Sequence, residues 1–477
     1  MNNKLKLNII ISTINQALTM ILPFVTAPYV SRTLGVEGIG IYSYTQSYVA
    51  IFSMFATLGT NSYGVREIAR SRNDIKQRSH IFWEIEILSI FTSFLTIMLW
   101  LIWVTTNSKY RLLFGILTIC LFGNMFDISW FFAGVEEFKY TVILNILFKF
   151  IGMFSIFFYV NKPEDLWKYV FILSMVIFGA NVSLWLFLKK YICHVSIKQL
   201  KPLSHLKNTI VFFLPSIAVS IYTILDKTLI GIITNETSEN GNYEQATKIV
   251  NMCKTLSFTG LNAVFQSRLA FLFSQNKHDE IIKNIAFSME YIFFMGFGMC
   301  FGIIGMANRF VPLFFGAGYD KTIVLIKLLA PMIIIVGISN CLGAQYYIPA
   351  GFRSKSAKFI ILGSVINLSL NISLIPYFKS VGAVISTIIA ESIISLLYLI
   401  NCNGYYSIKL LKEHTWKKLI AGIGMCMIIH HLGEIIDNTA VALISQFTLG
   451  LLTYIFILCI LKDDALNYIK RFRKNNI

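Results

Sequence analysis

Long apolar segments alternate with short polar connections along almost the whole chain. A helix that crosses a bilayer needs about 20 mainly apolar residues, and charged or turn-forming breaks divide this sequence into fourteen segments of that kind. The predicted spans cover residues 8–31, 39–61, 81–104, 112–133, 141–160, 169–188, 208–233, 243–266, 284–307, 322–347, 359–376, 381–400, 419–434 and 440–461. The pattern therefore predicts an all-α polytopic membrane protein with about fourteen transmembrane helices.

The basic residues in the connections predict the orientation of these helices. Lysine and arginine are enriched in the cytoplasmic loops of membrane proteins. The N-terminus, every second connection and the C-terminal tail together hold 28 of the 41 basic residues, and the opposite connections hold 8. We therefore expect both termini in the cytoplasm, which requires an even number of spans.

A weak internal repeat divides the chain into two halves. Gly40, Tyr42, Gly59 and Asn61 recur as Gly241, Tyr243, Gly260 and Asn262 at one offset of 201 residues. Both sets frame the second helix of a six-helix unit, and such parallel halves are typical of transporters. We predict a six-helix lobe over residues 1–190, a cytoplasmic linker over 191–207, a second lobe over 208–400, and two further helices with a basic tail over 401–477.

Composition excludes the soluble classes of protein. Hydrophobic residues make up 56% of the chain and charged residues 14%, against roughly 25% charged in soluble proteins. The net charge of +17 does not indicate nucleic-acid binding, because the basic residues are scattered between apolar runs rather than gathered on one soluble face. The eight cysteines form no metal or redox pair. The connections are too short for an ATPase or catalytic domain, so we expect no cofactor and no enzymatic activity.

Charged residues inside the predicted spans indicate a basic cavity. At the 201-residue offset, Ser43, Ser47 and Ser53 of the first half correspond to Glu244, Lys248 and Lys254 of the second. Buried ammonium groups are costly unless an anion meets them. The candidate anion-binding residues are Lys248, Lys254, Arg268, Lys149 and Lys327, with Arg32 at the external end of the first helix.

Three acidic residues in the spans are candidates for ion coupling, namely Asp226, Glu244 and Glu391. A purely structural role remains an alternative for several of these side chains. Lys149 can extend to the membrane surface, Asp226 can neutralise the adjacent Lys227, and Lys254 can pair internally with Glu290 or Glu244.

Several motifs resemble those of bacterial polysaccharide repeat-unit flippases. These are the Wzx-type members of the MOP (multidrug/oligosaccharidyl-lipid/polysaccharide) exporter superfamily. Residues 28–40 (PYVSRTLGVEGIG) are similar to the N-terminal signature of that family, and residues 58–70 and 130–136 are similar to its segments after helices 2 and 4. Asp226 and Gly382-Ala383 extend the resemblance across the core. One departure is Gln266-Ser267-Arg268, where many members carry Pro-Arg.

The resemblance implies a MATE-like fold with a V-shaped cavity between two lobes. It also implies movement of undecaprenyl-diphosphate-linked oligosaccharide to the outer leaflet of a bacterial cytoplasmic membrane, for capsule, exopolysaccharide or O-antigen assembly. Membrane lipid, the polysaccharide polymerase and the glycosyltransferases of the pathway are the further expected partners. A multidrug exporter of the same superfamily is the main alternative, although lysines rather than carboxylates dominate the predicted cavity. A membrane polymerase or ligase is a further alternative that the short connections disfavour.

Overall fold

The computed structural model describes the backbone of residues 3–106 and 109–465. Within these ranges the chain forms helices joined by short connections, and no strand occurs. Side chains are described in the same ranges except residues 3–17, 20, 197, 214–216, 218–223, 259–260 and 263–264. The helices form two compact units, Met1–Thr228 and Leu229–Ile477. The unit boundary lies inside a helix, and the predicted division into lobes and linker stays a prediction.

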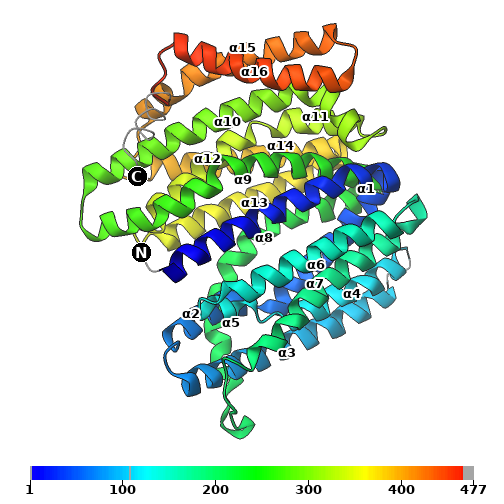
Figure 1. The fold of residues 1–477 in the computed structure, drawn as a ribbon, viewed down its shortest axis with the longest axis vertical. Helices are drawn as coiled ribbons and strands as arrows, with labels where there is room; N and C mark the ends of the chain where they lie inside the picture. Colours follow the sequence, from blue (N-terminus) through cyan, green and yellow to red (C-terminus); the bar gives the residue numbers. More distant parts are fainter. Residues whose placement is uncertain (1–2, 107–108, 466–477) are drawn as a thin grey trace. The chain divides into compact units, whose positions relative to one another are not determined.

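Unit 1 is a bundle of long helices. Its elements are α1 (Asn3–Thr57), α2 (Thr60–Arg70), α3 (Ile75–Thr106), α4 (Arg111–Met125), α5 (Ser129–Gly134), α6 (Phe138–Tyr159), α7 (Leu166–Leu188) and most of α8 (Leu206–Thr234), with 3₁₀ turns at Pro163–Asp165, Ile197–Gln199 and Pro202–His205. Within this unit α1 packs against α3 and α6, and α7 packs against α4 and α6. Figure 1 shows α4, α6 and α7 running nearly parallel.

Glycines set the breaks between the first elements. Gly35 adopts a φ of 68° inside α1, so the first two predicted spans follow each other along one kinked helix. Gly59 adopts a left-handed conformation (φ 75°) between α1 and α2, and a Cβ there would lie 2.7 Å from the carbonyl oxygen of Thr209. Only glycine tolerates both the backbone angle and the close approach. The corresponding Gly260 lies within an unbroken helix, so the repeat is not exact in backbone conformation.

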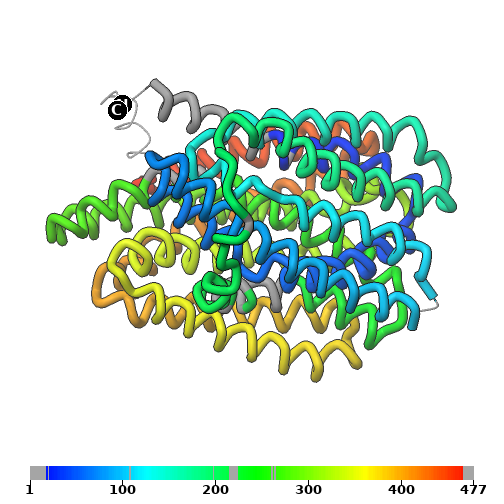
Figure 2. The backbone as a smooth tube through the Cα atoms, turned by 90° about the horizontal axis from the view of Figure 1, so that it is seen from below, coloured from blue at the N-terminus to red at the C-terminus, as the bar shows by residue number. Residues whose placement is uncertain are grey.

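Unit 2 contains the last residues of α8 and all elements after it. These are α9 (Thr237–Ser274), α10 (His278–Phe315), α11 (Asp320–Leu329), α12 (Met332–Leu342), a π-helical segment (Gly343–Tyr347), α13 (Arg353–Phe378), α14 (Ser380–Ile400), α15 (Ile408–Ile435) and α16 (Thr439–Ile460). Figure 1 shows α15 and α16 side by side next to α10, and both pack against it. Figure 2 shows the yellow and orange helices α13 and α14 together, the most closely packed pair of this unit.

The helices confirm an all-α, multi-span membrane protein. In the described residues, nine helices are long and apolar enough to cross a membrane, or ten if the bent pair of α11 and α12 with its π segment forms one span. The bent pair corresponds to the predicted span 322–347. The predicted span 419–434 was short, but α15 has 28 residues. Large apolar side chains remain exposed on the bundle surface, among them Phe158 (75%) and Leu186 (76%), as expected where lipid replaces water. The count of fourteen is compatible with these helices and stays a prediction.

Candidate functional site

The predicted anion-binding residues of unit 2 lie on two elements. Lys248, Lys254 and Arg268 belong to α9; Lys248 and Lys254 are half-buried and Arg268 is exposed. Lys327 belongs to α11, where its Nζ donates a hydrogen bond of 2.8 Å to Asn308 Oδ1 of α10. The structure therefore gives Lys327 an internal partner that the sequence did not indicate.

Two internal partners were expected for Lys254, namely Glu290 and Glu244. Glu290 pairs with Lys418 instead, so the expected contact with Glu290 is wrong. The carboxylate of Glu391, on α14, acts electrostatically on Lys254. Glu244 has an interaction within the structure, and its pairing with Lys254 stays a prediction. Lys254 thus interacts electrostatically with Glu391, one of the three carboxylates predicted for ion coupling.

The predicted cations of unit 1 occupy different surroundings. Lys149 of α6 is half-buried, and its Nζ donates to Thr19 Oγ1 of α1 at 2.8 Å. Arg32 of α1 is exposed and lines a cavity of about 720 Å³ together with Tyr29, Asn161 and Lys162. The hydroxyl of Tyr29 donates to the carbonyl oxygen of Val160 at 2.7 Å, which fixes one wall of this cavity. The sequence did not single out Lys162 as a second cation beside Arg32.

Two of the three predicted coupling carboxylates are buried. Asp226 in α8 is 2% exposed and Glu391 in α14 is 6% exposed, whereas Glu244 in α9 is half-buried. Each of the three has polar or electrostatic interactions within the structure. Near Glu391 in sequence, Thr387 accepts a hydrogen bond from Asn367 Nδ2 at 3.2 Å, and Asn371 donates to Asn367 Oδ1. The α13–α14 pair thus carries a polar strip inside unit 2.

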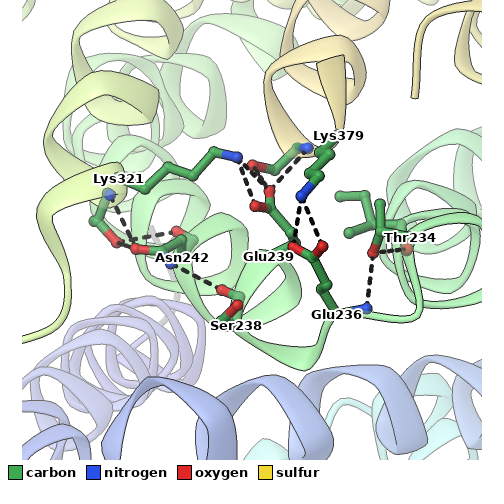
Figure 3. A network of polar contacts seen from close by, with 10 residues as sticks. Thr234, Glu236, Ser238, Glu239, Asn242, Lys321 and Lys379 are labelled. Carbon is green, nitrogen blue, oxygen red and sulfur yellow. Dashed lines mark hydrogen bonds and ion pairs between the residues drawn. The ribbon is translucent and has the colours of Figure 1, made fainter. Parts of the chain in front are cut away.

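A polar network at one end of unit 2 connects the starts of three helices. Figure 3 shows Glu239 of α9 facing Lys321 of α11, whose Nζ donates to both carboxylate oxygens at 2.6 and 2.7 Å. The backbone N–H and the hydroxyl of Ser380, at the start of α14, donate to Glu239 at 3.1 and 2.6 Å. A carboxylate at a helix N-terminus is favoured by the helix dipole. Glu239 therefore holds α9, α11 and α14 together.

Neighbouring residues extend this network. Lys379 donates to both carboxylate oxygens of Glu236 at 2.7 and 2.8 Å (Figure 3). Asn242 Oδ1 accepts hydrogen bonds from the backbone N–H and the hydroxyl of Thr322. The hydrogen bond with Glu236 raises the pKa of Lys379. Burial acts to raise the pKa of Glu239, but hydrogen bonds from Lys321 and Ser380 outweigh it, so the pKa is lowered. The lowered pKa keeps Glu239 charged at neutral pH.

A buried ionic cluster attaches the last two helices to α10. The Nζ of Lys418 in α15 donates to Glu290 Oε1 of α10 at 2.5 Å and to Asp463 Oδ2 after α16 at 3.0 Å. The side chains of Lys418, Glu290 and Asp463 are only 0%, 3% and 2% exposed. His414 lies 3.3 Å from Glu290 Oε2 and completes the cluster. The sequence did not single it out, because Lys418 lies in a predicted connection and Asp463 in the predicted tail.

A second unexpected cluster fixes the connection before α8 within unit 1. Glu84 of α3 accepts hydrogen bonds from the backbone N–H of Lys201 (2.7 Å) and pairs with His205 Nε2 (2.9 Å). The Nδ1 of His205 lies 2.7 Å from the Tyr63 hydroxyl of α2. The predicted cytoplasmic linker is therefore bound to α2 and α3 by a tyrosine–histidine–glutamate chain.

The family of the chain follows from its first half. Residues 5–265 match the model of a family described as "Polysaccharide biosynthesis protein". The chain belongs to this family. The matched region includes the motifs at residues 28–40, 58–70 and 130–136 and Asp226, whereas Gly382-Ala383 lies outside it.

Relatives and solved structures of similar fold agree with this membership. A putative O-antigen transporter of Escherichia coli (strain K12) is 25% identical over 415 residues, covering 83% of this chain and 97% of that protein. A putative O-antigen transporter of Shigella dysenteriae is 24% identical, covering 83% and 99%. Among solved structures, a lipid II flippase MurJ in an inward closed conformation has a TM-score of 0.67 at 16% identity, covering 95% of this chain and 98% of that one.

An inward-facing multidrug resistance MATE family transporter of the MOP superfamily has a TM-score of 0.65 at 15% identity, covering 85% of this chain and 98% of that one. These likenesses confirm that this member of the polysaccharide biosynthesis family has the predicted MOP/MATE-like fold. The two polysaccharide relatives are named as transporters, and the two solved structures described above are named as a flippase and a transporter.

Proposed function

We propose that the chain is a flippase for lipid-linked oligosaccharide repeat units. It moves undecaprenyl-diphosphate-linked oligosaccharide from the cytoplasmic to the outer leaflet by alternating access, for O-antigen, capsule or exopolysaccharide assembly. The observation that carries the proposal is the alignment with two putative O-antigen transporters over 97% and 99% of their lengths. The family match and the fold shared with a lipid II flippase support it.

The substrate head group is the part that the charged residues of α9 can recognise. A diphosphate concentrates negative charge, and its desolvation has to be offset by cations. We assign Lys248 and Lys254 to the diphosphate, because both are half-buried in a helix of unit 2. Arg268, Lys149 and Lys327 remain secondary candidates in this proposal. The hydrogen bonds of Lys149 and Lys327 to Thr19 and Asn308 also suit a structural role.

Arg32 is assigned to capture or release of the substrate on the outer side. It lines a cavity that contains a second cation, Lys162, and two cations suit the two phosphates of the head group. The location of this cavity on the outer side rests on the predicted topology.

Uphill transport needs an energy source, and no ATPase segment was found in the sequence. We propose that a proton or sodium gradient drives the cycle and that Asp226 contributes to the coupling. Its near-complete burial in α8 supports the assignment. Glu244 and Glu391 are the alternative coupling residues, and Glu391 in particular lies in a polar part of α14, beside Thr387.

The proposed location is the bacterial cytoplasmic membrane, with both termini in the cytoplasm. The asymmetry of 28 to 8 basic residues supports this topology. Reporter fusions at Asp74, Ser204 and after Lys462 should report cytoplasm, and fusions at Glu236 and Asp437 should report the outside. A reversed signal at Asp74 or Ser204 would contradict the assignment. The polymerase and glycosyltransferases of the pathway are proposed as partners.

The function is tested in proteoliposomes with labelled undecaprenyl-diphosphate-linked oligosaccharide. The substrate should become accessible to an external sugar-modifying reagent only when the protein is present and correctly folded. Two other outcomes would contradict the proposal. Resistance to toxic organic cations on overexpression, without oligosaccharide transport, would indicate a multidrug exporter. A covalent change in the labelled substrate would indicate a polymerase or ligase.

A further inference from the structure

Glu86 of α3 is a fully buried carboxyl group with no hydrogen-bond partner. It is 0% exposed, and neither of its side-chain oxygens accepts a hydrogen bond of normal geometry. Its neighbours in sequence, Phe82 and Ile85, belong to an apolar core cluster with Trp130. Glu86 therefore lies inside the packed part of unit 1, where neither lipid head groups nor water reach it in this conformation.

Two polar groups act on Glu86 in opposite directions: a carboxyl group disfavours its ionised state, and an N–H group favours it. Among the described side chains these are Asp127 and the indole N–H of Trp130. Asp127 lies in the break between α4 and α5 and accepts a hydrogen bond from the backbone N–H of Ser129 at 2.9 Å. It is a second carboxyl group rather than a cation. The indole N–H of Trp130 has no hydrogen-bond partner of normal geometry either.

Charged groups on the other elements that pack near Glu86 are engaged elsewhere. On α2, Arg66 and Arg70 pair with Glu67. In the connection before α8, His205 pairs with Glu84, which lies two residues before Glu86 in α3. No described cation neutralises Glu86.

An unpaired carboxylate in an apolar interior costs many kcal/mol, so such a group takes up a proton instead. A neighbouring carboxylate strengthens this preference because like charges repel. The packing of Glu86 thus requires a protonated side chain in the conformation seen. The carboxyl group can ionise only after the surroundings change, for example when α4 and α5 move at their break.

We propose that Glu86 is a proton-binding site of the transport cycle, with Asp127 as the group that exchanges the proton with solvent. In the step proposed, the O–H bond of Glu86 breaks and its proton passes to the Asp127 carboxylate, directly or through one water molecule, leaving Glu86 ionised. Asp127 is suited to this role because it is less deeply buried than Glu86 and lies at a helix break. The inference rests on the proposed transport function and adds a coupling residue to it.

The chemistry favours a proton over a metal cation at this site. A hard cation requires several oxygen ligands, and no group of three or more acidic, histidine or cysteine side chains suited to a metal occurs among the described residues. The candidates from the sequence, Asp226, Glu244 and Glu391, all have interactions within the structure. Glu86 differs from them in that neither of its oxygens accepts a hydrogen bond of normal geometry.

The first test reads the protonation state of Glu86 directly. Infrared spectra of the purified full-length protein at neutral pH should contain the carbonyl stretch of a protonated, non-hydrogen-bonded carboxylic acid. Glu86→Gln should remove this band. Glu84→Gln is the matched control, because Glu84 is on the same helix but is hydrogen-bonded to Lys201 and His205, and it should leave the band unchanged. A wild-type spectrum without the band, or a band that survives Glu86→Gln, overturns the proposal.

The second test measures whether transport is coupled to a proton gradient. In proteoliposomes, a pH gradient should accelerate movement of labelled lipid-linked oligosaccharide by the wild-type protein. Glu86→Gln should lose this acceleration and keep exchange in the absence of a gradient. Equal acceleration of both proteins, or none in the wild type, overturns the coupling role. If the wild-type protein moves no substrate at all, the proposed function fails, and the infrared result still decides whether Glu86 holds a proton.

A second variant protects the test against misfolding of Glu86→Gln. Asp127→Asn removes the like charge that acts on Glu86. The infrared band should then disappear at a lower pH than in the wild type, because ionisation of Glu86 becomes easier. A band whose pH dependence does not change contradicts the proposed pairing of the two carboxyl groups.

Discussion

Replacement of Lys418 by methionine should destabilise the attachment of α15 and α16 more than any surface change. The substitution keeps an unbranched side chain of similar length but removes the charge between Glu290 and Asp463. Those two carboxylates are 3% and 2% exposed, so water cannot replace the ammonium group. Breaking a buried ion pair by removing one partner typically costs about 3–5 kcal/mol.

Proton uptake gives an independent estimate of the same cost. Without Lys418, at least one of the two carboxyls has to take up a proton. For an ordinary carboxyl with a pKa near 4.3, protonation at pH 7 costs roughly 4 kcal/mol, at about 1.4 kcal/mol per pH unit. The two estimates agree. The second estimate also predicts that the destabilisation shrinks as the pH falls toward 5, because protonation then becomes cheaper.

The assay is unfolding of the purified protein at pH 5 and pH 8, combined with hydrogen exchange of the α15 and α16 amides. Lys412→Met is the matched control, because Lys412 is on the same helix and exposed, and it should change stability by less than about 0.5 kcal/mol. The triple variant Lys418→Met, Glu290→Gln, Asp463→Asn should regain most of the loss, since uncharged replacement of a whole buried cluster is often tolerated. A Lys418→Met protein as stable as wild type, or equally destabilised at both pH values, would refute the reasoning.

Four further predictions concern other parts of the chain. Lys254→Gln should reduce transport by the equivalent of about 1–3 kcal/mol, whereas Lys254→Arg should retain more activity; full activity of both in well-expressed protein excludes a substrate contact. Asp226→Asn should impair gradient-driven transport in proteoliposomes, and an undiminished uphill rate without any gradient would argue against coupling. Gly382→Ala should destabilise the protein by about 1–3 kcal/mol in an unfolding measurement, because the added Cβ would lie 2.6 Å from the carbonyl oxygen of Leu374. Gly115→Ala, whose added Cβ would meet nothing within 4 Å, should not. The pKa of Glu239 is lowered in the folded state, so the charged side chain stabilises the protein above the ordinary carboxyl pKa of about 4.3, and this stabilisation is lost as the pH falls further. The stability difference between wild type and Glu239→Gln should therefore vanish in acid. A difference that stays constant with pH would contradict this.

The apolar spans could be predicted from the sequence because a bilayer imposes a length and a hydropathy on each helix separately. That constraint is local, so α3 and α10 each contain a predicted span, α6 and α16 each match one to within a residue at its end, and the all-α membrane fold follows. The hydropathy pattern did not predict the helix breaks that lie within a span. The break between α4 and α5 and the bend between α11 and α12 do not interrupt the apolar run, and hydropathy does not report backbone direction.

The partners of the charged residues were decided by the tertiary structure alone. Glu290, Lys418 and Asp463 are separated by 128 and 45 residues, and their burial follows only when α15 and α16 pack against α10. Glu86 and Glu84 are two residues apart, yet helical geometry turns one into an apolar core and the other toward His205. The sequence determined where charges enter the membrane-spanning segments. Packing determined which of them are neutralised, because electrostatic interactions depend on distances and burial that no local pattern contains.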